Sequence, residues 1–207
     1  MECSRGAAVT ISGVARLDAE SLSRLHEIRL RGVVQTDDTV IARLVEVGYV
    51  MRSNKGVRIT IEGRELHTVW ARLPAGSDAE TAARRAYERF LPLNRELVRI
   101  CHDWQVTAGG VANDHTDLRY DWSVIDRLRS LDERAAPVVS RLARTVTRFA
   151  EYRPRLRTAL ARVDDGDAAW LTSPRCDSYH TVWMRLHEDL LLALGADRGA
   201  EPDPEQA

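Results

Sequence analysis

The chain has 207 residues, enough for one large domain or two small ones, each with its own core. Its 44% hydrophobic and 29% charged residues are typical of an ordinary globular protein, and a formal net charge of -1 excludes a general electrostatic attraction to nucleic acid. No apolar run approaches the roughly 20 residues that cross a bilayer, and the N-terminus lacks a signal peptide's apolar core. We therefore expect a cytoplasmic protein without a membrane partner.

The first predicted elements are two helices. Residues 1–16 show no strong period, although Val9, Ile11 and Val14 are compatible with a short strand. Apolar residues then recur at near-helical spacing from Leu17, with Asp18 as a candidate N-cap and Gly32 at the end of the segment.

A second helix is predicted from Thr36 to about Val47. The Thr36 hydroxyl would cap the first amides, Asp37 and Asp38 would occupy the first turn, and Gly48 would follow the last turn. Val40, Ile41, Leu44 and Val47 would form its buried stripe.

A β-hairpin and a third helix complete the N-terminal part. Two β-rich runs flank the turn Ser53-Asn54-Lys55-Gly56, and the second run alternates apolar with polar residues up to Ile61. A helix is expected from Glu62 to Arg72. The stretch Pro74-Ala75-Gly76-Ser77 then breaks the chain, so we predict a first domain over residues 1–73.

The second domain, residues 76–195, is predicted to be helical. Its first helix would run from 78 to about 106, with Pro92 at a kink or boundary, and further helices would span 121–134, 137–152, 154–164 and 178–194. The apolar face of the last helix suits either a second copy of the chain or its own domain. The acidic, proline-containing tail, residues 196–207, is predicted to be disordered.

The order helix, helix, hairpin, helix over residues 17–72 is typical of a winged helix. In such a fold a short helix enters the major groove of DNA while the hairpin contacts the adjacent backbone. The hairpin carries the local positive charge that this function needs, with no acid between Tyr49 and Ile61 and the only lysine of the chain, Lys55, at its tip. The predicted fold class is therefore mainly α with a small β-hairpin wing, an N-terminal winged helix followed by a helical dimerisation and effector region.

The same segments resemble MarR-like winged helix-turn-helix regulators. The pattern Leu44-x-x-x-Gly48 followed by two hydrophobic residues, and the pattern Thr60-x-x-Gly63-Arg-Glu-Leu66, match the family's turn into the wing and its exit. The short lead-in before the first helix departs from that family, and the layout is closer to PadR-type regulators. Residues 113–117, 120–122 and 178–183 are also similar to actinobacterial MarR-like proteins. The resemblance implies a homodimeric transcription regulator that binds double-stranded DNA.

On this interpretation the second helix reads base edges and the wing holds phosphates. Arg43 is the best candidate for a guanine contact, while Asp37 and Asp38 would repel the DNA backbone, so we expect modest affinity that depends on dimerisation. The candidate DNA-binding residues are Gln35, Thr36, Thr39 and Arg43, with Asp38 also in reach, and Arg52, Asn54, Lys55 and Arg58 in the wing.

The helical domain contains aromatic residues beside a few polar groups, as a pocket for a small-molecule effector requires. Those residues are Trp104, His115, Tyr120, Trp122, His180 and Trp183. A metal site is a further hypothesis, with His180, His187 and either Glu188 or Asp189 as ligands. The sequence favours the alternative that these histidines are hydrogen bonded at a packing surface, because no HExxH or other ligand spacing occurs.

Enzymatic function is not expected. Cys3, Cys101 and Cys176 are odd in number and far apart, which indicates neither a disulfide framework nor a zinc ribbon, and no common nucleophile or nucleotide motif occurs. We therefore predict no catalytic residue, metal or cofactor. Two alternatives stay open: a winged-helix module that binds a protein instead of DNA, and a small helical enzyme with His115 and Asp117 as acid and base.

Overall fold

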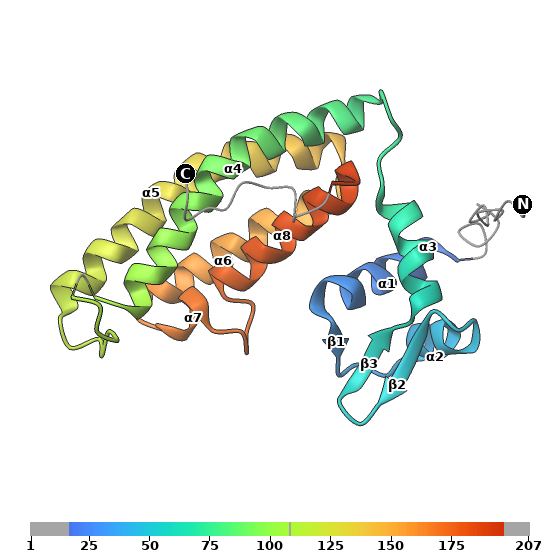
Figure 1. Cartoon of the computed structure of the whole chain (residues 1–207), viewed down its shortest axis with the longest axis horizontal. Coiled ribbons are helices and arrows are strands. Elements are labelled where there is room, and N and C mark those ends of the chain that lie inside the picture. The colour runs from blue at the N-terminus through green and yellow to red at the C-terminus, as the bar shows by residue number, and fades with distance from the viewer. Residues whose placement is uncertain (1–16, 108, 197–207) are drawn as a thin grey trace, which may run out of the picture. The chain divides into compact units, whose positions relative to one another are not determined.

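The computed structural model describes residues 17–107 and 109–196, and it divides the chain into two units, residues 1–73 and 74–207 (Figure 1). The predicted strand near Val9 and the predicted disordered tail beyond residue 196 lie outside the described residues. Within the described residues, none of the helices is both long and apolar enough to cross a membrane.

The first unit combines helices with a small antiparallel sheet whose strand order is β1-β3-β2 (Figure 1). Its elements, in chain order, are α1 (Ala19–Arg31), β1 (Val33–Val34), α2 (Thr39–Glu46), β2 (Val50–Ser53), β3 (Gly56–Ile59) and α3 (Ile61–Ala71).

Helix α1 has the predicted ends. The Asp18 carboxylate accepts a hydrogen bond of 2.8 Å from the Ser21 amide, which satisfies one of the free N–H groups of the first turn. Gly32 ends the helix at a φ of 79°, a conformation that costs a residue without Cβ little. Both predictions from the sequence are confirmed.

Helix α2 begins two residues later than predicted, because Asp38 and not Thr36 is its N-cap. One Asp38 carboxylate oxygen accepts hydrogen bonds from the amides of Val40 and Ile41, each 3.0 Å long. Aspartate is a stronger capping residue than threonine, and extended backbone at Asp38 suits the cap position. The prediction that Thr36 caps the helix and that both aspartates lie in its first turn was wrong.

The predicted hairpin is confirmed, with Asn54 and Lys55 as its two-residue loop between the paired Ser53 and Gly56. Strand β1 was not predicted, because two residues are too few to show a period. It lies so close to the hairpin that a Cβ on Gly56 would stand 2.5 Å from the carbonyl oxygen of Val34. Glycine at position 56 therefore permits the third strand.

The core of the first unit lies between the helices and one face of the sheet. Leu25, Ile28, Ile41 and Leu44 are fully buried there. Helix α3 approaches so closely that a Cβ on Gly63 would stand 2.0 Å from the carbonyl oxygen of Tyr49. Close packing thus fixes the start of α3 against the residue that precedes β2.

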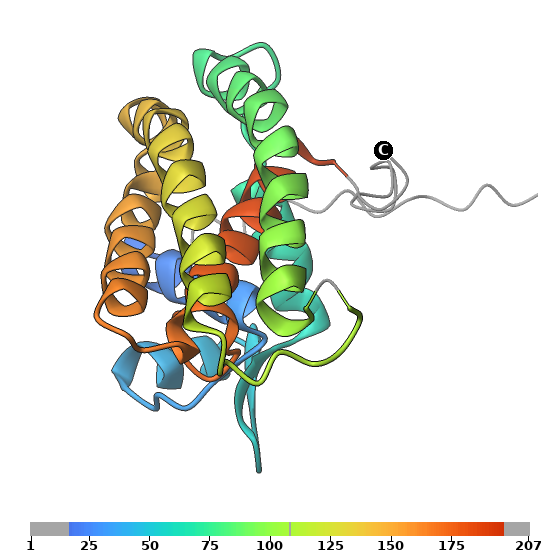
Figure 2. The ribbon, with the colours of Figure 1, turned by 90° about the vertical axis from the view of Figure 1, so that its left-hand side faces the viewer.

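The second unit is a helical bundle. Its elements are α4 (Asp78–Gln105), α5 (Leu118–Thr145), the 3₁₀ helix η2 (Thr147–Glu151), α6 (Tyr152–Asp164), α7 (Ala169–Thr172) and α8 (Tyr179–Leu194). Among the described residues α4 contacts α5, α5 contacts α6, α6 contacts α8, and α8 contacts α4, so these four form a closed bundle. Figure 2 shows α4, α5 and α6 side by side, with α8 behind them.

Helix α4 has nearly the predicted bounds, whereas α5 is longer than predicted because it continues through a proline. Pro92 lies inside α4, and Pro137 lies inside α5, so the separate helices predicted at 121–134 and 137–152 are wrong. Each proline removes one backbone hydrogen bond. Both prolines are exposed, so the carbonyls that lose that bond are near solvent, while apolar residues of the neighbouring turns stay packed in the bundle.

The apolar face of α8 packs within its own unit. Trp183 is fully buried, its ring lies 4.7 Å from that of Phe90, and its indole N–H donates a 2.9 Å hydrogen bond to Asn94 Oδ1. His187 is also buried and lies against Phe90. Of the two alternatives for this face, the structure therefore shows the intramolecular one.

Candidate nucleic-acid interface

Helix α2 presents one face to solvent. Val40, Ile41 and Leu44 are buried, whereas Thr39, Ala42, Arg43 and Glu46 are exposed. The exposed residues recur every three or four positions, as the outer face of a helix requires. Of the predicted base-reading residues, Thr39 and Arg43 therefore lie on one accessible helical face, and Thr36 lies exposed in the segment before it.

Arg43 is held by an acid of another helix. Its guanidinium donates to the Asp18 carboxylate, the same group that caps α1. The hydrogen bonds from Ser21, and then the charge of Arg43, hold the pKa of Asp18 below its usual value. Asp18 is thus ionised at neutral pH and competes with any other acceptor for Arg43.

Arg52 is also paired, in a two-point contact with Asp37. Its Nε and one terminal nitrogen lie 3.1 and 2.8 Å from the two carboxylate oxygens. The contact lowers the pKa of Asp37 and raises that of Arg52, chiefly through the hydrogen bonds. Asp38 meets another guanidinium, that of Arg24, at 3.0 Å. Both aspartates that precede α2 are therefore neutralised by neighbouring arginines.

The hairpin tip is ordered by hydrogen bonds to its own backbone. Gln35 donates to the carbonyl oxygen of Lys55 at 2.8 Å, and the Ser53 hydroxyl donates to the carbonyl oxygen of Gly56 at the same distance. The side chains of Asn54 and Lys55 are exposed. Within the described part of the chain, neither Lys55 nor Arg58 forms an ion pair.

The sheet separates Arg52 from Arg58. Strand β3 alternates, with Val57 and Ile59 buried and Arg58 exposed, and the register places Arg52 opposite Val57 and Met51 opposite Arg58. Residues opposite one another share a face of the sheet. Arg52 therefore lies on the α2 side, whereas Arg58 lies on the outer face.

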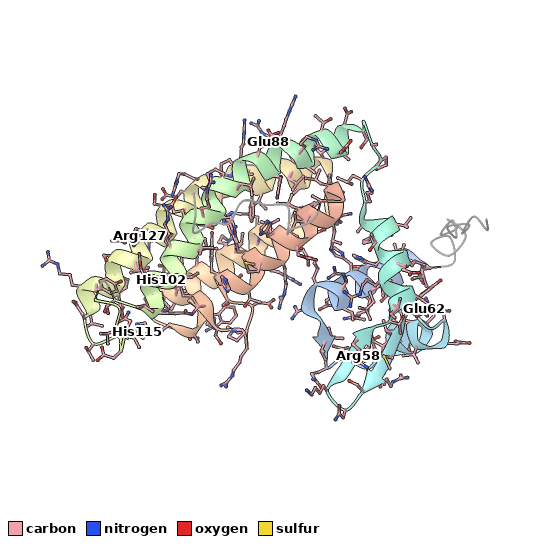
Figure 3. The ribbon with its side chains drawn as sticks, in the orientation of Figure 1. Arg58, Glu62, Glu88, His102, His115 and Arg127 are labelled. Atoms are coloured by element: carbon pink, nitrogen blue, oxygen red, sulfur yellow. The ribbon has the colours of Figure 1, made fainter. Side chains whose placement is uncertain are left out.

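The outer face of the sheet is partly apolar. Val33 and Met51 flank Arg58 in the register, both exposed, and the side chain of Ile61 is 73% exposed. They line a hollow of about 690 Å³. Arg58 and Glu62, two of the residues that line it, are labelled in Figure 3. The sequence did not predict this surface, because strand β1 was not predicted. It also did not predict the carboxylate partners of Arg43 and Arg52, because each arginine is far from its partner in the sequence.

The predicted effector residues do not form one pocket. Three of them gather at the connection from α4 to α5 (Figure 3 labels His115). The rings of Trp104 and His115 lie 4.5 Å apart, His115 Nδ1 is 3.0 Å from Asp121 Oδ2, and the Tyr120 hydroxyl donates to the carbonyl oxygen of Asp103. This cluster is occupied by its own hydrogen bonds.

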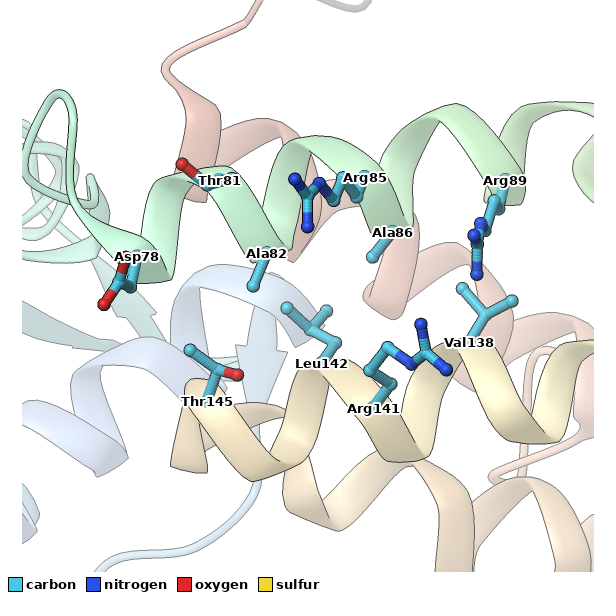
Figure 4. Close-up of a pocket in the computed structure, with 10 residues that line it drawn as sticks. All are labelled: Asp78, Thr81, Ala82, Arg85, Ala86, Arg89, Val138, Arg141, Leu142 and Thr145. Carbon is cyan, nitrogen blue, oxygen red and sulfur yellow. The ribbon is translucent and has the colours of Figure 1, made fainter.

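The other three predicted effector residues lie apart from that cluster. Trp122 is 46% exposed with the Arg129 guanidinium 5.5 Å from its ring, while Trp183 is in the bundle core. His180 lies in the first turn of α8, and burial lowers its pKa. A cavity between α4 and α5, which Figure 4 shows, is lined by none of the six.

The acid–base pair of the enzyme alternative is not assembled. Asp117 caps α5 by accepting a hydrogen bond from the Tyr120 amide, and the carboxylate beside His115 is that of Asp121 instead. His115 is itself more than one-third exposed. Among the described residues no group of three potential ligands could hold a metal ion, and His187 packs against Phe90.

Comparison with protein-family models, with curated proteins and with solved structures finds no match to this chain. Function must therefore be inferred from the residues and their geometry.

Proposed function

We propose that the chain is a transcription regulator that binds double-stranded DNA as a homodimer, with residues 17–71 as a winged helix similar to that of MarR-like regulators. The succession of α2 and the β2–β3 hairpin within one small unit supports this assignment, because a winged helix contacts DNA with a short helix and with the hairpin that follows it. The helical unit would supply dimerisation and effector binding.

Two features of the first unit carry the proposal. Helix α2 has an exposed face, and the hairpin tip bears Lys55, the only lysine of the sequence. Thr39 and Arg43 would enter the major groove, and Lys55 would contact phosphates. The ion pair of Asp38 with Arg24 reduces the repulsion of DNA that the sequence alone suggests. Arg43 and Arg52 would exchange their carboxylate partners for DNA on binding.

Lys55→Ala should weaken binding to every duplex sequence about equally. A phosphate contact carries no sequence information, and its loss should reduce the slope of log affinity against log salt by about one. Fluorescence anisotropy titrations at several salt concentrations measure both. Arg43→Ala should instead reduce the preference for one sequence over another.

Asp37→Asn should have the opposite effect on affinity. Removing the carboxylate charge frees Arg52, so duplex binding should tighten several-fold, and more at low salt than at high salt. Glu65→Gln is the matched control, since it removes one exposed negative charge from α3 of the same unit. If both variants, or neither, tighten binding, Arg52 does not contact DNA; if the native protein shows no salt-dependent duplex binding, the proposal fails.

A second function is favoured by the outer face of the sheet. Exposed Val33, Met51 and Ile61, with three arginines and one glutamate around the same hollow, suit a protein partner that presents apolar and acidic residues. Absence of duplex binding, together with loss of a protein complex in Met51→Glu, would support this alternative. Light scattering of the native chain tests the proposed homodimer in either case.

A further inference from the structure

The line of contact between α4 and α5, here called the seam, has an ion pair that recurs after seven residues. Asp103 of α4 meets Arg127 of α5 at 2.6 Å, and Glu96 meets Arg134 at 2.5 Å. Seven residues are close to two helical turns, so antiparallel helices repeat the same juxtaposition at that interval. Each such position combines an acid on α4 with an arginine on α5.

The next position in this series breaks the pattern. Seven residues before Glu96 stands Arg89, and seven residues after Arg134 stands Arg141, so two arginines face each other where an acid and an arginine are expected. Figure 4 shows their side chains pointing toward one another between α4 and α5. The seam thus lacks one negative charge at this position.

A cavity of about 420 Å³ opens at the same place. Ala86 and Leu142, both buried, form part of its apolar lining, and Arg85 adds a third guanidinium. The volume is within the range of small-molecule sites. The complete lining is Asp78, Thr81, Ala82, Arg85, Ala86, Arg89, Val138, Arg141, Leu142 and Thr145.

The three guanidinium groups of the cavity are not neutralised by the chain. Within residues 17–107 and 109–196, none of Arg85, Arg89 and Arg141 forms an ion pair, whereas the adjacent Arg84 binds Glu80 at 2.8 Å. Arg85 and Arg89 are also four residues apart on one helix, which is unfavourable for like charges. An anion between these groups would remove the repulsion, and guanidinium groups bind carboxylate and phosphate with two parallel hydrogen bonds.

We propose that this cavity binds an amphipathic anion. Its carboxylate or phosphate head lies between Arg89 and Arg141, in the position of the missing acid, and its apolar body covers Ala86 and Leu142. The binding is a property of the helical unit alone. Its regulatory consequence, a change in DNA affinity, rests on the proposed function and requires unequal affinity for the DNA-binding and non-binding states.

Four probes with one alkyl chain test the head group: octanoate, octyl phosphate, octanol and octylamine. They are titrated into the full-length chain, with methyl-labelled leucine and valine, in a buffer without carboxylate or phosphate. Octanoate or octyl phosphate should shift the methyl signals of Leu142 and Val138 and saturate, and the stronger of the two identifies the head group. Octanol and octylamine should bind at least tenfold more weakly.

Arg89→Glu should abolish the site and stabilise the bundle at once. It restores the acid–arginine alternation of the seam, so anion affinity should fall more than tenfold while Tm rises by about 2–4 °C. Arg157→Glu on α6 is the control, because it makes the same charge change at an exposed residue outside the cavity. A conservative variant, Arg89→Lys, should weaken binding less than Arg89→Glu does.

Three results would overturn the proposal: no saturable shift with either anion, equal binding of octanol, or unchanged affinity in Arg89→Glu. Dissociation of a native dimer by Arg89→Glu would also overturn it, since a second copy would then supply the missing acid. None of these measurements involves DNA. Anion binding without any duplex binding would therefore retain the site and reject the DNA-binding function.

Discussion

Asp132 and Asp189 lie almost fully buried in the helical bundle, and each is held by an arginine and a tyrosine. Asp132 lies 2.6 Å from Arg153 and accepts a 3.0 Å hydrogen bond from the Tyr179 hydroxyl. Asp189 is arranged in the same way, with Arg148 at 3.0 Å and Tyr152 at 3.2 Å. A buried ion pair adds little net stability, but the loss of one partner leaves the other uncompensated.

Asp132→Asn should therefore destabilise the protein by about 2–3 kcal/mol, because the partly buried Arg153 would lose its counter-charge. Urea unfolding measures the change. The control is Asp126→Asn, which removes an exposed carboxylate from Arg129 and should cost less than about 0.5 kcal/mol. Equal effects would show that Asp132 contributes only as a surface pair does.

At the scale of the element, the start of α2 shows how a sequence signal can be ambiguous. Thr36, Asp37 and Asp38 are all acceptable capping residues, and periodicity alone does not choose between them. The structure chooses Asp38, because β1 pairs with β3 just before this segment and the next three residues cross to the helix. Tertiary pairing thus decides where this helix begins.

Asp38→Ala should cost about 1 kcal/mol, as the loss of an N-cap usually does, whereas Thr36→Ala should be neutral. Asp38→Asn separates the cap from the charge, since asparagine caps equally well and Arg24 keeps its ion pair with Glu27 at 2.9 Å. The free energy of unfolding of Asp38→Asn should therefore be close to that of the native protein. Guanidinium unfolding of the three variants checks the order; a larger loss in Thr36→Ala would contradict the observed helix start.

At the scale of the whole molecule, three buried acidic groups set the alkaline limit of stability. Burial raises the pKa of Cys101 to about 12, and burial with the neighbouring Asp189 and Asp132 raises the pKa values of Tyr152 and Tyr179 above their usual value. All three groups stay protonated in the folded state at pH values where the unfolded chain loses its protons. Their contribution to stability is therefore complete below pH 9 and is lost as pH rises toward 12.

The free energy of unfolding should consequently fall between pH 9 and pH 11, by up to about 1.4 kcal/mol per pH unit for each group ionised only in the unfolded chain. Cys101→Ala should make this decline less steep, whatever its effect at pH 7. Urea unfolding at several pH values gives the two slopes. Identical slopes would show that the Cys101 thiol ionises equally in both states.

Elements whose signals are local could be predicted from the residues alone. The ends of α1, the two-residue hairpin loop and the start of α4 follow from Asp18, Gly32, the Ser53–Gly56 turn and the Pro74–Ser77 break, because capping and turn chemistry act within a few residues. The tertiary structure alone decided the rest. Strand β1 is too short to show a period in the sequence. The exposed prolines 92 and 137 are tolerated inside helices only because the neighbouring turns pack in the bundle. The surroundings of four arginines, Arg43, Arg52, Arg89 and Arg141, are set by residues far away in the chain. Local rules fix where a helix can begin, whereas charge pairing and cavities depend on which surfaces the fold brings together.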